Sequence, residues 1–200
     1  GVGDNYGIAA VDLIAEETGT TGASATIATN SDIDGMSGNN DKIAYHLPAM
    51  GGLTAGVSFA DSGTNTGTDT TAYGFRYTTE AAGSSITIGG ASASTEVAGA
   101  ADKDSQNLGI KIVNGNLSFS MSQGTEEAAD ENQEMMGAAL SYKMGNGMTL
   151  GAYTVDGDDS LDAGEEYTAS GFEVQYTIAS GLTAVVIVED YEYKAPTTAD

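Results

Sequence analysis

The stretch Asp41-Lys42-Ile43-Ala44-Tyr45-His46-Leu47-Pro48-Ala49-Met50-Gly51-Gly52-Leu53-Thr54-Ala55-Gly56-Val57-Ser58-Phe59-Ala60 contains the basic folding unit of this chain. Large apolar residues alternate with small or polar ones on both sides of a glycine pair. Because successive side chains of a β-strand point to opposite faces, each half predicts a strand with one apolar and one polar face. Gly51-Gly52 predicts a tight turn, so the stretch as a whole predicts a β-hairpin.

Comparable glycine-rich turns recur along the chain, and a longer, acidic segment separates each turn from the next. One glycine from each turn gives positions 51, 83, 115, 147 and 181, so the intervals are 32, 32, 32 and 34 residues. Short turns at one end of the strands and long loops at the other are typical of an outer-membrane β-barrel. We expect ten strands, at about 41–48, 53–60, 71–80, 85–94, 105–113, 117–124, 134–144, 148–156, 166–178 and 182–194.

The two faces of these predicted strands differ in chemistry. Tyr73, Phe75 and Tyr77 share one face of a strand, for example, and small or polar residues share the other. In the last strand, residues 185–188 are all apolar, so the pattern does not set its phase, and a bulge is one explanation. Tyrosines precede four of the five turns at a similar step, which is typical of an aromatic girdle at a membrane surface. These are Tyr45, Tyr77, Tyr142 and Tyr176.

The polar face also carries most of the cations and the single histidine. Lys103, in a predicted loop, and Lys194, at a strand end, fall outside this set. A water-filled lumen accounts for such sorting, and so does the solvated outer face of a soluble β-sandwich. The candidate pore-wall residues are Lys42, His46, Arg76, Lys111 and Lys143.

The composition excludes several classes of function. The formal net charge is -23 and the pI about 4.1, so binding of nucleic acid through phosphate neutralisation is not expected. There is no cysteine, hence no disulfide and no thiolate ligand or nucleophile. His46 has no identifiable nucleophile partner, and no phosphate-binding loop is present. We therefore expect no enzymatic activity and no cofactor other than Ca²⁺, discussed below.

Residues 40–59 resemble a segment of the general bacterial porins, in which an Asn-x-Ile-x-Tyr-x-x-Pro-x-x-x-Gly-like strand and turn follow the loop that folds into the channel. Residues 140–151 also resemble a porin hairpin, of the form found in α-proteobacterial and marine lineages. The resemblance implies an all-β fold: a sixteen-stranded antiparallel transmembrane β-barrel, about ten strands of which are represented here. It also implies a homotrimer in the cell outer membrane. The matching residues are Asn40, Ile43, Tyr45, Pro48 and Gly51 or Gly52, with one extra residue after the asparagine.

The same resemblance implies a division of the chain at residue 40. Residues 1–40 take the place of the inward-folded constriction loop, and residues 41–200 form barrel hairpins. By position, Asp12, Glu16 and Glu17 are candidate acidic residues of a constriction facing the basic wall. The other interpretation is that they form the solvated side of a surface helix.

The function implied is a passive diffusion channel for small hydrophilic solutes and ions, with a charged constriction and an acidic mouth that concentrates cations. The expected partners are outer-membrane lipid, two further copies of the chain and small polar solutes. Docking of a phage or a surface layer through the long loops is a further hypothesis.

The acidic segment 156–166 has a second interpretation. Its oxygen ligands on a glycine-containing loop suit Ca²⁺, with Asp156, Asp158, Asp159 and Asp162 as candidate ligands, although the pattern favours an unliganded acidic rim. The alternative function is therefore an acidic, calcium-stabilised extracellular β-rich structural or adhesin protein. Such a protein would bury the apolar face against a second sheet.

Overall fold

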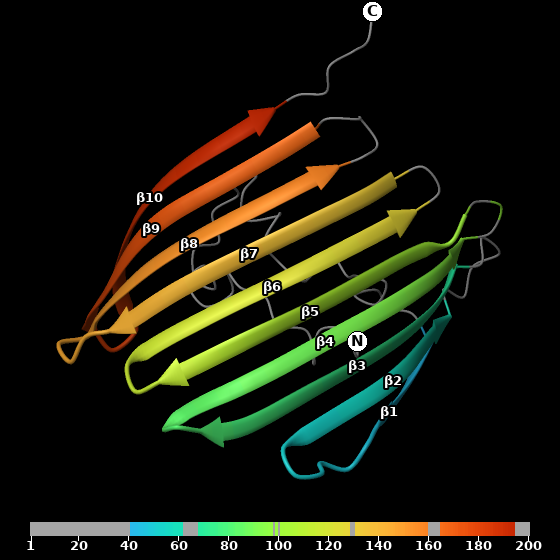
Figure 1. The fold of residues 1–200 in the computed structure, drawn as a ribbon, viewed down its shortest axis with the longest axis horizontal. Coiled ribbons are helices and arrows are strands. Elements are labelled where there is room, and N and C mark those ends of the chain that lie inside the picture. Colours follow the sequence, from blue (N-terminus) through green and yellow to red (C-terminus); the bar gives the residue numbers. More distant parts are fainter. Residues whose placement is uncertain are drawn as a thin grey trace, which may run out of the picture.

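The structure is a computed structural model that describes residues 41–61, 68–97, 99, 101–128, 131–159 and 165–194. These residues form one sheet of ten antiparallel strands in chain order (Figure 1), which confirms the predicted number and order. Among the described residues the sheet is open, with β1 and β10 at its edges. The strands are β1 (Asp41–His46), β2 (Leu53–Asp61), β3 (Thr68–Ala81), β4 (Ser84–Val97), β5 (Lys103–Asn114), β6 (Leu117–Ala128), β7 (Glu131–Lys143), β8 (Met148–Asp159), β9 (Glu165–Ala179) and β10 (Leu182–Lys194).

The short turns follow the predicted glycines. Gly52, with φ +88°, and the other turn glycines 83, 115, 147 and 181 all lie in the left-handed region, which favours glycine. A Cβ atom on Gly52 would also overlap the carbonyl oxygen of Thr78 on β3. The first hairpin turn therefore needs glycine both for its backbone conformation and for its contact with the next hairpin.

Most strands extend further from these turns than the sequence predicted, although β1 ends at His46, two residues before its predicted end, and β10 has its predicted bounds. β6 continues to Ala128 and β7 begins at Glu131, so the expected long connection between them is short. β8 continues through Asp156 and Asp158 to Asp159, which were expected in a loop. Alternation of apolar residues stops before these strand ends, but backbone pairing continues because it needs no apolar face. The hydrophobic pattern therefore marked the apolar part of each strand and not its end.

The register explains the ambiguous last strand. The pairing is continuous from Thr183 to Lys194, so the bulge considered for residues 185–188 is not present there. The register shift of this strand lies earlier, between Leu182 and Thr183. Beyond it, Val186 pairs with Val174 and Ile187 pairs with Glu173. Val186 therefore shares the face of the apolar residues on β9, and Ile187 shares the polar face.

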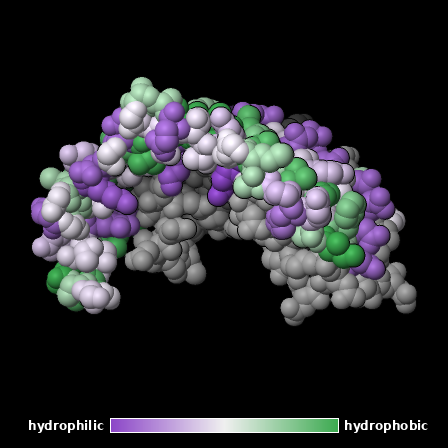
Figure 2. All heavy atoms as spheres, turned by 90° about the horizontal axis from the view of Figure 1, so that it is seen from below, coloured by the Kyte–Doolittle hydropathy of each residue, from purple (hydrophilic) through white to green (hydrophobic). Residues whose placement is uncertain are grey.

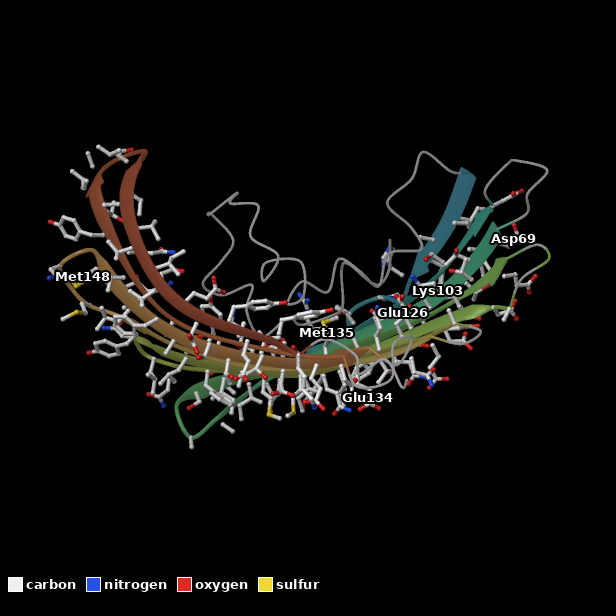
Figure 3. The ribbon with its side chains drawn as sticks, turned by 90° about the horizontal axis from the view of Figure 1, so that it is seen from above. Asp69, Lys103, Glu126, Glu134, Met135 and Met148 are labelled. Atoms are coloured by element: carbon white, nitrogen blue, oxygen red, sulfur yellow. The ribbon has the colours of Figure 1, made fainter. Side chains whose placement is uncertain are left out.

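The sheet is strongly curved, and its alternating residues divide between a concave and a convex side (Figures 2 and 3). Met135 lies on the concave side and Glu134 on the convex side (Figure 3). Paired residues lie on the same side of a sheet. We call the side that carries Met135 the inner face and the side that carries Glu134 the outer face, and we assign the other residues to a face through the pairing register.

The outer face exposes its large apolar side chains, whereas the buried residues of the inner face are mostly small. Ile43 and Val188, on the outer face, are 76% and 66% exposed. Ala72 and Ser120, on the inner face, are fully buried. Within the described part of the chain no second sheet covers the apolar face, contrary to what the adhesin alternative requires. The described residues contain no helix long and apolar enough to cross a membrane.

Candidate functional site

The inner face can be followed across the strands through the pairing register. One row of paired residues begins at Thr78 on β3 and ends at Glu189 on β10. It places a cation on β5 and a carboxylate on β10, with three small residues and one tyrosine between them. The members of the row are Thr78, Thr87, Lys111, Ser120, Ala139, Tyr153, Gly171 and Glu189.

All five predicted pore-wall residues occupy inner-face register positions, but they do not form one cluster. Arg76 pairs with Gly89, and Lys111 pairs with Thr87 on the same strand, β4. The backbones of Arg76 and Lys111 are therefore two strands apart and one inward-facing position out of step, or about 12 Å. His46 on the edge strand β1 has the same offset from Arg76, whereas Lys42 on β1 and Lys143, beside the turn that joins β7 to β8, lie further away.

The prediction that Lys103 lies in a loop was wrong. Lys103 is the first residue of β5 and lies on the inner face. Its Nζ is 2.7 Å from Oε1 of Glu126 on β6, and both side chains are partly exposed. Five of the six lysine and arginine residues are thus at inner-face positions, and only Lys194 is at an outer-face position. Since Glu126 pairs with Lys103, the net charge that this cation adds to the inner face is reduced.

A carboxylate on β10 forms the opposite part of the row. The hydroxyl of Tyr153 on β8 donates a hydrogen bond of 2.6 Å to Oε1 of Glu189. Gly171 on β9 lies between them in register, and a Cβ atom at this position would overlap the tyrosine ring. Glycine at position 171 therefore lets the tyrosine lie across β9 and reach the next strand.

A second carboxylate lies one inward-facing position away on β9. Glu173 is only 2% exposed, and Nε2 of Gln175 donates a hydrogen bond to its Oε1. Glu173 pairs with Gly151 on one side and with Ile187 on the other, so no cation is its direct register neighbour. Glu173 and Glu189, with Tyr153 and Gln175, make an acidic group on the inner face that we call the β9–β10 acidic group.

The sequence analysis did not single out either carboxylate. The alternation of the sequence placed Glu173 on the polar face of its strand, but nothing distinguished it from the other residues on that face. Glu189 was hidden because the apolar run before it left the phase of β10 undetermined. Polarity alone would not have found it, because Asp190, Glu192 and Lys194 lie in phase with Val186 and Val188 on the outer face.

Small side chains separate the acidic group from the cations. Ser118, Ser120 and Ser141 are buried inner-face residues of β6 and β7, with Ala139 beside them. The sheet curves so that β1–β3 and β9–β10 rise at opposite ends of the concave side (Figure 3). The inner face is therefore a polar, concave wall with Arg76 on β3 and Lys111 on β5, and with the β9–β10 acidic group toward the other end. Lys143, at the turn end of β7, has its backbone about 12 Å from that of Glu173. Such an arrangement imposes an electric field across the hollow.

The predicted constriction carboxylates Asp12, Glu16 and Glu17 lie outside the described residues, as does the whole of the proposed loop region 1–40. Their role stays a prediction.

The candidate calcium ligands are only partly described. Asp156 and Asp158 lie on the outer face of β8 and accept hydrogen bonds, from the Thr168 hydroxyl and the Glu134 backbone N–H respectively. Asp159 ends β8 at an inner-face register position, and Asp162 lies outside the described residues. No three His, Cys, Asp or Glu side chains within the described ranges are arranged to hold a metal ion. Calcium binding stays a prediction.

Comparison with known proteins agrees with this geometry. The family model described as Gram-negative porin matches residues 2–196. The crystal structure of Acinetobacter baumannii OccAB4 is similar at a TM-score of 0.65 and 12% identity, covering 76% of this chain and 48% of that one. OccAB2 of the same organism gives 0.65 and 12%, covering 80% and 50%. Pseudomonas aeruginosa OccD3 (OpdP) gives 0.63 and 11%, covering 78% and 52%.

The chain thus spans about half the length of these structures, and at such low identity they show the fold alone. A search of curated proteins found no match.

Proposed function

Since the chain belongs to the Gram-negative porin family, we propose that its inner face lines a passive diffusion channel for small hydrophilic solutes and ions. The protein resides in the outer membrane, where the exposed apolar outer face contacts lipid. The concave inner face then borders water. A channel of this kind performs no covalent chemistry, and it provides a hydrated path through the hydrocarbon layer.

The observation that carries the proposal is a concave, polar inner face with an uneven distribution of charge, behind an outer face of exposed apolar side chains. Arg76 and Lys111 lie on β3 and β5, and the β9–β10 acidic group lies at the other end of the same curved wall. A field between these two regions orients dipolar and zwitterionic solutes. It disfavours apolar ones, because they cannot replace the ordered water that they displace. The selectivity of the channel then depends on which charged region the solute approaches more closely.

We extend the proposal to the parts that the sequence analysis predicted. Residues 1–40 fold inward and narrow the pore, with Asp12, Glu16 and Glu17 adding negative charge. The complete barrel assembles as a homotrimer. Carboxylates at the loop ends of the strands, such as Asp61, Asp69 and Glu127, make the mouth acidic and favour entry of cations.

Planar-bilayer conductance of the full-length protein tests the proposal. Under a salt gradient we expect stable conductance steps and a reversal potential of the sign that indicates cation preference. The Glu173→Gln and Glu189→Gln double variant should shift that potential toward anion preference. The absence of conductance from folded, membrane-inserted protein would contradict the channel proposal. An unchanged potential in the variant would show that these carboxylates do not border the ion path.

A further inference from the structure

A groove crosses the outer face, on the side of the sheet opposite to the proposed channel. It runs across the strands between two neighbouring rows of outward-facing side chains. Its larger part extends from β2 to β6 with a volume of about 670 Å³. A smaller part of about 250 Å³ continues from β6 to β8, and Gln123 lines both.

The first part of the groove is apolar, because Phe75, Gly90 and Leu108 line it. Gly90 on β4 occupies an outer-face position between Phe75 and Leu108. A Cβ atom there would lie 3.0 Å from Cε1 of Phe75 and 3.3 Å from Cδ1 of Leu108. The Phe75 and Leu108 side chains thus lie close against Gly90, and they give this end of the groove apolar walls.

The middle part of the groove is polar but uncharged. Gln106, Gln123 and Thr125 line it on β5 and β6. Among the described residues that line the groove between β2 and β6, none is charged. The amide and hydroxyl groups of these side chains can donate hydrogen bonds to the carbonyl oxygens of the ester or amide linkages of a lipid.

The far part of the groove is acidic. Glu134 on β7 and Asp156 and Asp158 on β8 line it. The only cation at an outer-face position of the described strands is Lys194, which is paired with Glu166. The groove therefore changes from apolar through neutral to negative along its length, over about 15 Å between β4 and β7.

We propose that this groove binds one membrane lipid whose headgroup carries an ammonium group. An acyl chain lies against Gly90, Phe75 and Leu108, the linkage region contacts the two glutamines, and the ammonium group approaches Glu134 and Asp158. Lipid is the natural occupant because the outer face of an outer-membrane protein is in contact with it. The charge at the acidic end selects against anionic headgroups. The inference does not depend on conduction, so it can fail or succeed independently of the channel proposal.

Native mass spectrometry of the full-length, detergent-extracted protein tests the inference. The protein is offered equimolar phosphatidylethanolamine and phosphatidylglycerol with identical acyl chains. Exposed charge pairs are weak, so we expect a preference of about two- to fivefold for phosphatidylethanolamine at the tightest site. Equal retention of both lipids would overturn the assignment of the headgroup.

Variants separate the two ends of the groove. Glu134→Gln with Asp158→Asn should abolish the headgroup preference while leaving a lipid bound. Ser92→Phe, which fills the groove from its opposite wall, should lower occupancy about tenfold through loss of apolar contact. Gly90→Leu fills the same space, but its Cβ would lie 2.9 Å from the Asn107 carbonyl oxygen, so Ser92→Phe is the safer variant. Ala152→Leu enlarges an exposed outer-face residue of β8 outside the groove and is the matched control.

Unchanged occupancy in folded Ser92→Phe would overturn the proposed site. The site would also be overturned if a second copy of the protein occupied the groove. Because the chain has no cysteine, Gln106→Cys introduces a single thiol at the groove. Efficient disulfide cross-linking of two chains through it in the membrane would show that a second copy of the protein occupies the groove.

Discussion

The inner face has the same alternating architecture on β3–β5 and on β8–β10, but the two regions hold their charges differently. Arg76 and Lys111 stand in rows of glycine, serine and threonine. Glu189 and Glu173, in contrast, receive hydrogen bonds from Tyr153 and Gln175. The two carboxylates therefore lie against larger side chains that donate to them, whereas the direct register neighbours of Arg76 and Lys111 are small. The comparison predicts that the acidic region is sensitive to packing and the basic region mainly to charge.

The largest expected effect comes from filling the space that the tyrosine occupies. Gly171→Val places a side chain where the Tyr153 ring lies, so the ring must move and the bond to Glu189 is lost. Overpacking of this kind costs about 1–3 kcal/mol. We expect a lower midpoint of thermal unfolding, measured by circular dichroism in detergent.

Gly124→Val is the matched control for that variant. Gly124 is also an inner-face glycine, on β6, but its nearest neighbour to an added Cβ atom would be the Gln106 carbonyl oxygen at 3.5 Å, an ordinary contact. Equal destabilisation by the two variants would show that the cost comes from the loss of glycine on a strand and not from the tyrosine.

The next effect is on ion selectivity. Removing both charges of the β9–β10 acidic group, with Glu173→Gln and Glu189→Gln, should reduce the cation-to-anion permeability ratio about two- to fivefold, since each charge acts through water over several ångströms. The reversal potential under a salt gradient measures it. The effect should shrink at high salt, and an effect that is independent of salt would point to a structural change instead.

A smaller change of opposite sign is expected from the basic region. Arg76→Ser with Lys111→Ser should raise the same permeability ratio about two- to threefold, and the two single variants should contribute additively because the backbones of the two residues are about 12 Å apart. Lys194→Ser, which removes a cation from the outer face, is the control and should leave selectivity unchanged. Strong non-additivity would mean that Arg76 and Lys111 act on one bound ion.

These two regions also differ in how far the sequence could predict them. The cations on β3 and β5 were identified because Tyr73, Phe75 and Tyr77 set the phase of β3 and Ile110 and Ile112 that of β5. A single charged residue in such a strand has an unambiguous face. The ten strands, their order and their turns followed from the same alternation and from the glycine spacing.

The acidic region could not be read in the same way. Residues 185–188 are apolar on both faces, so periodicity gives no phase for Glu189, and the register shift after Leu182 is a property of pairing rather than of the strand itself. The contact between Tyr153 and Glu189 spans three strands, and it depends on a glycine that has no signature of its own. The strand ends were underestimated because backbone pairing continues into polar sequence after the apolar pattern stops.

The smallest expected effect isolates the fixing of the acidic carboxylate from its charge. Tyr153→Phe keeps the ring over Gly171 and removes only the hydroxyl that donates to Glu189. The bond lies at an exposed site, so its loss should cost about 0.5 kcal/mol, at the lower end for a hydrogen bond. The charge is unchanged, so the sign of the reversal potential should stay the same. If Tyr153→Phe changed selectivity as much as loss of both carboxylates, the position of Glu189, and not its charge alone, would determine which ions pass.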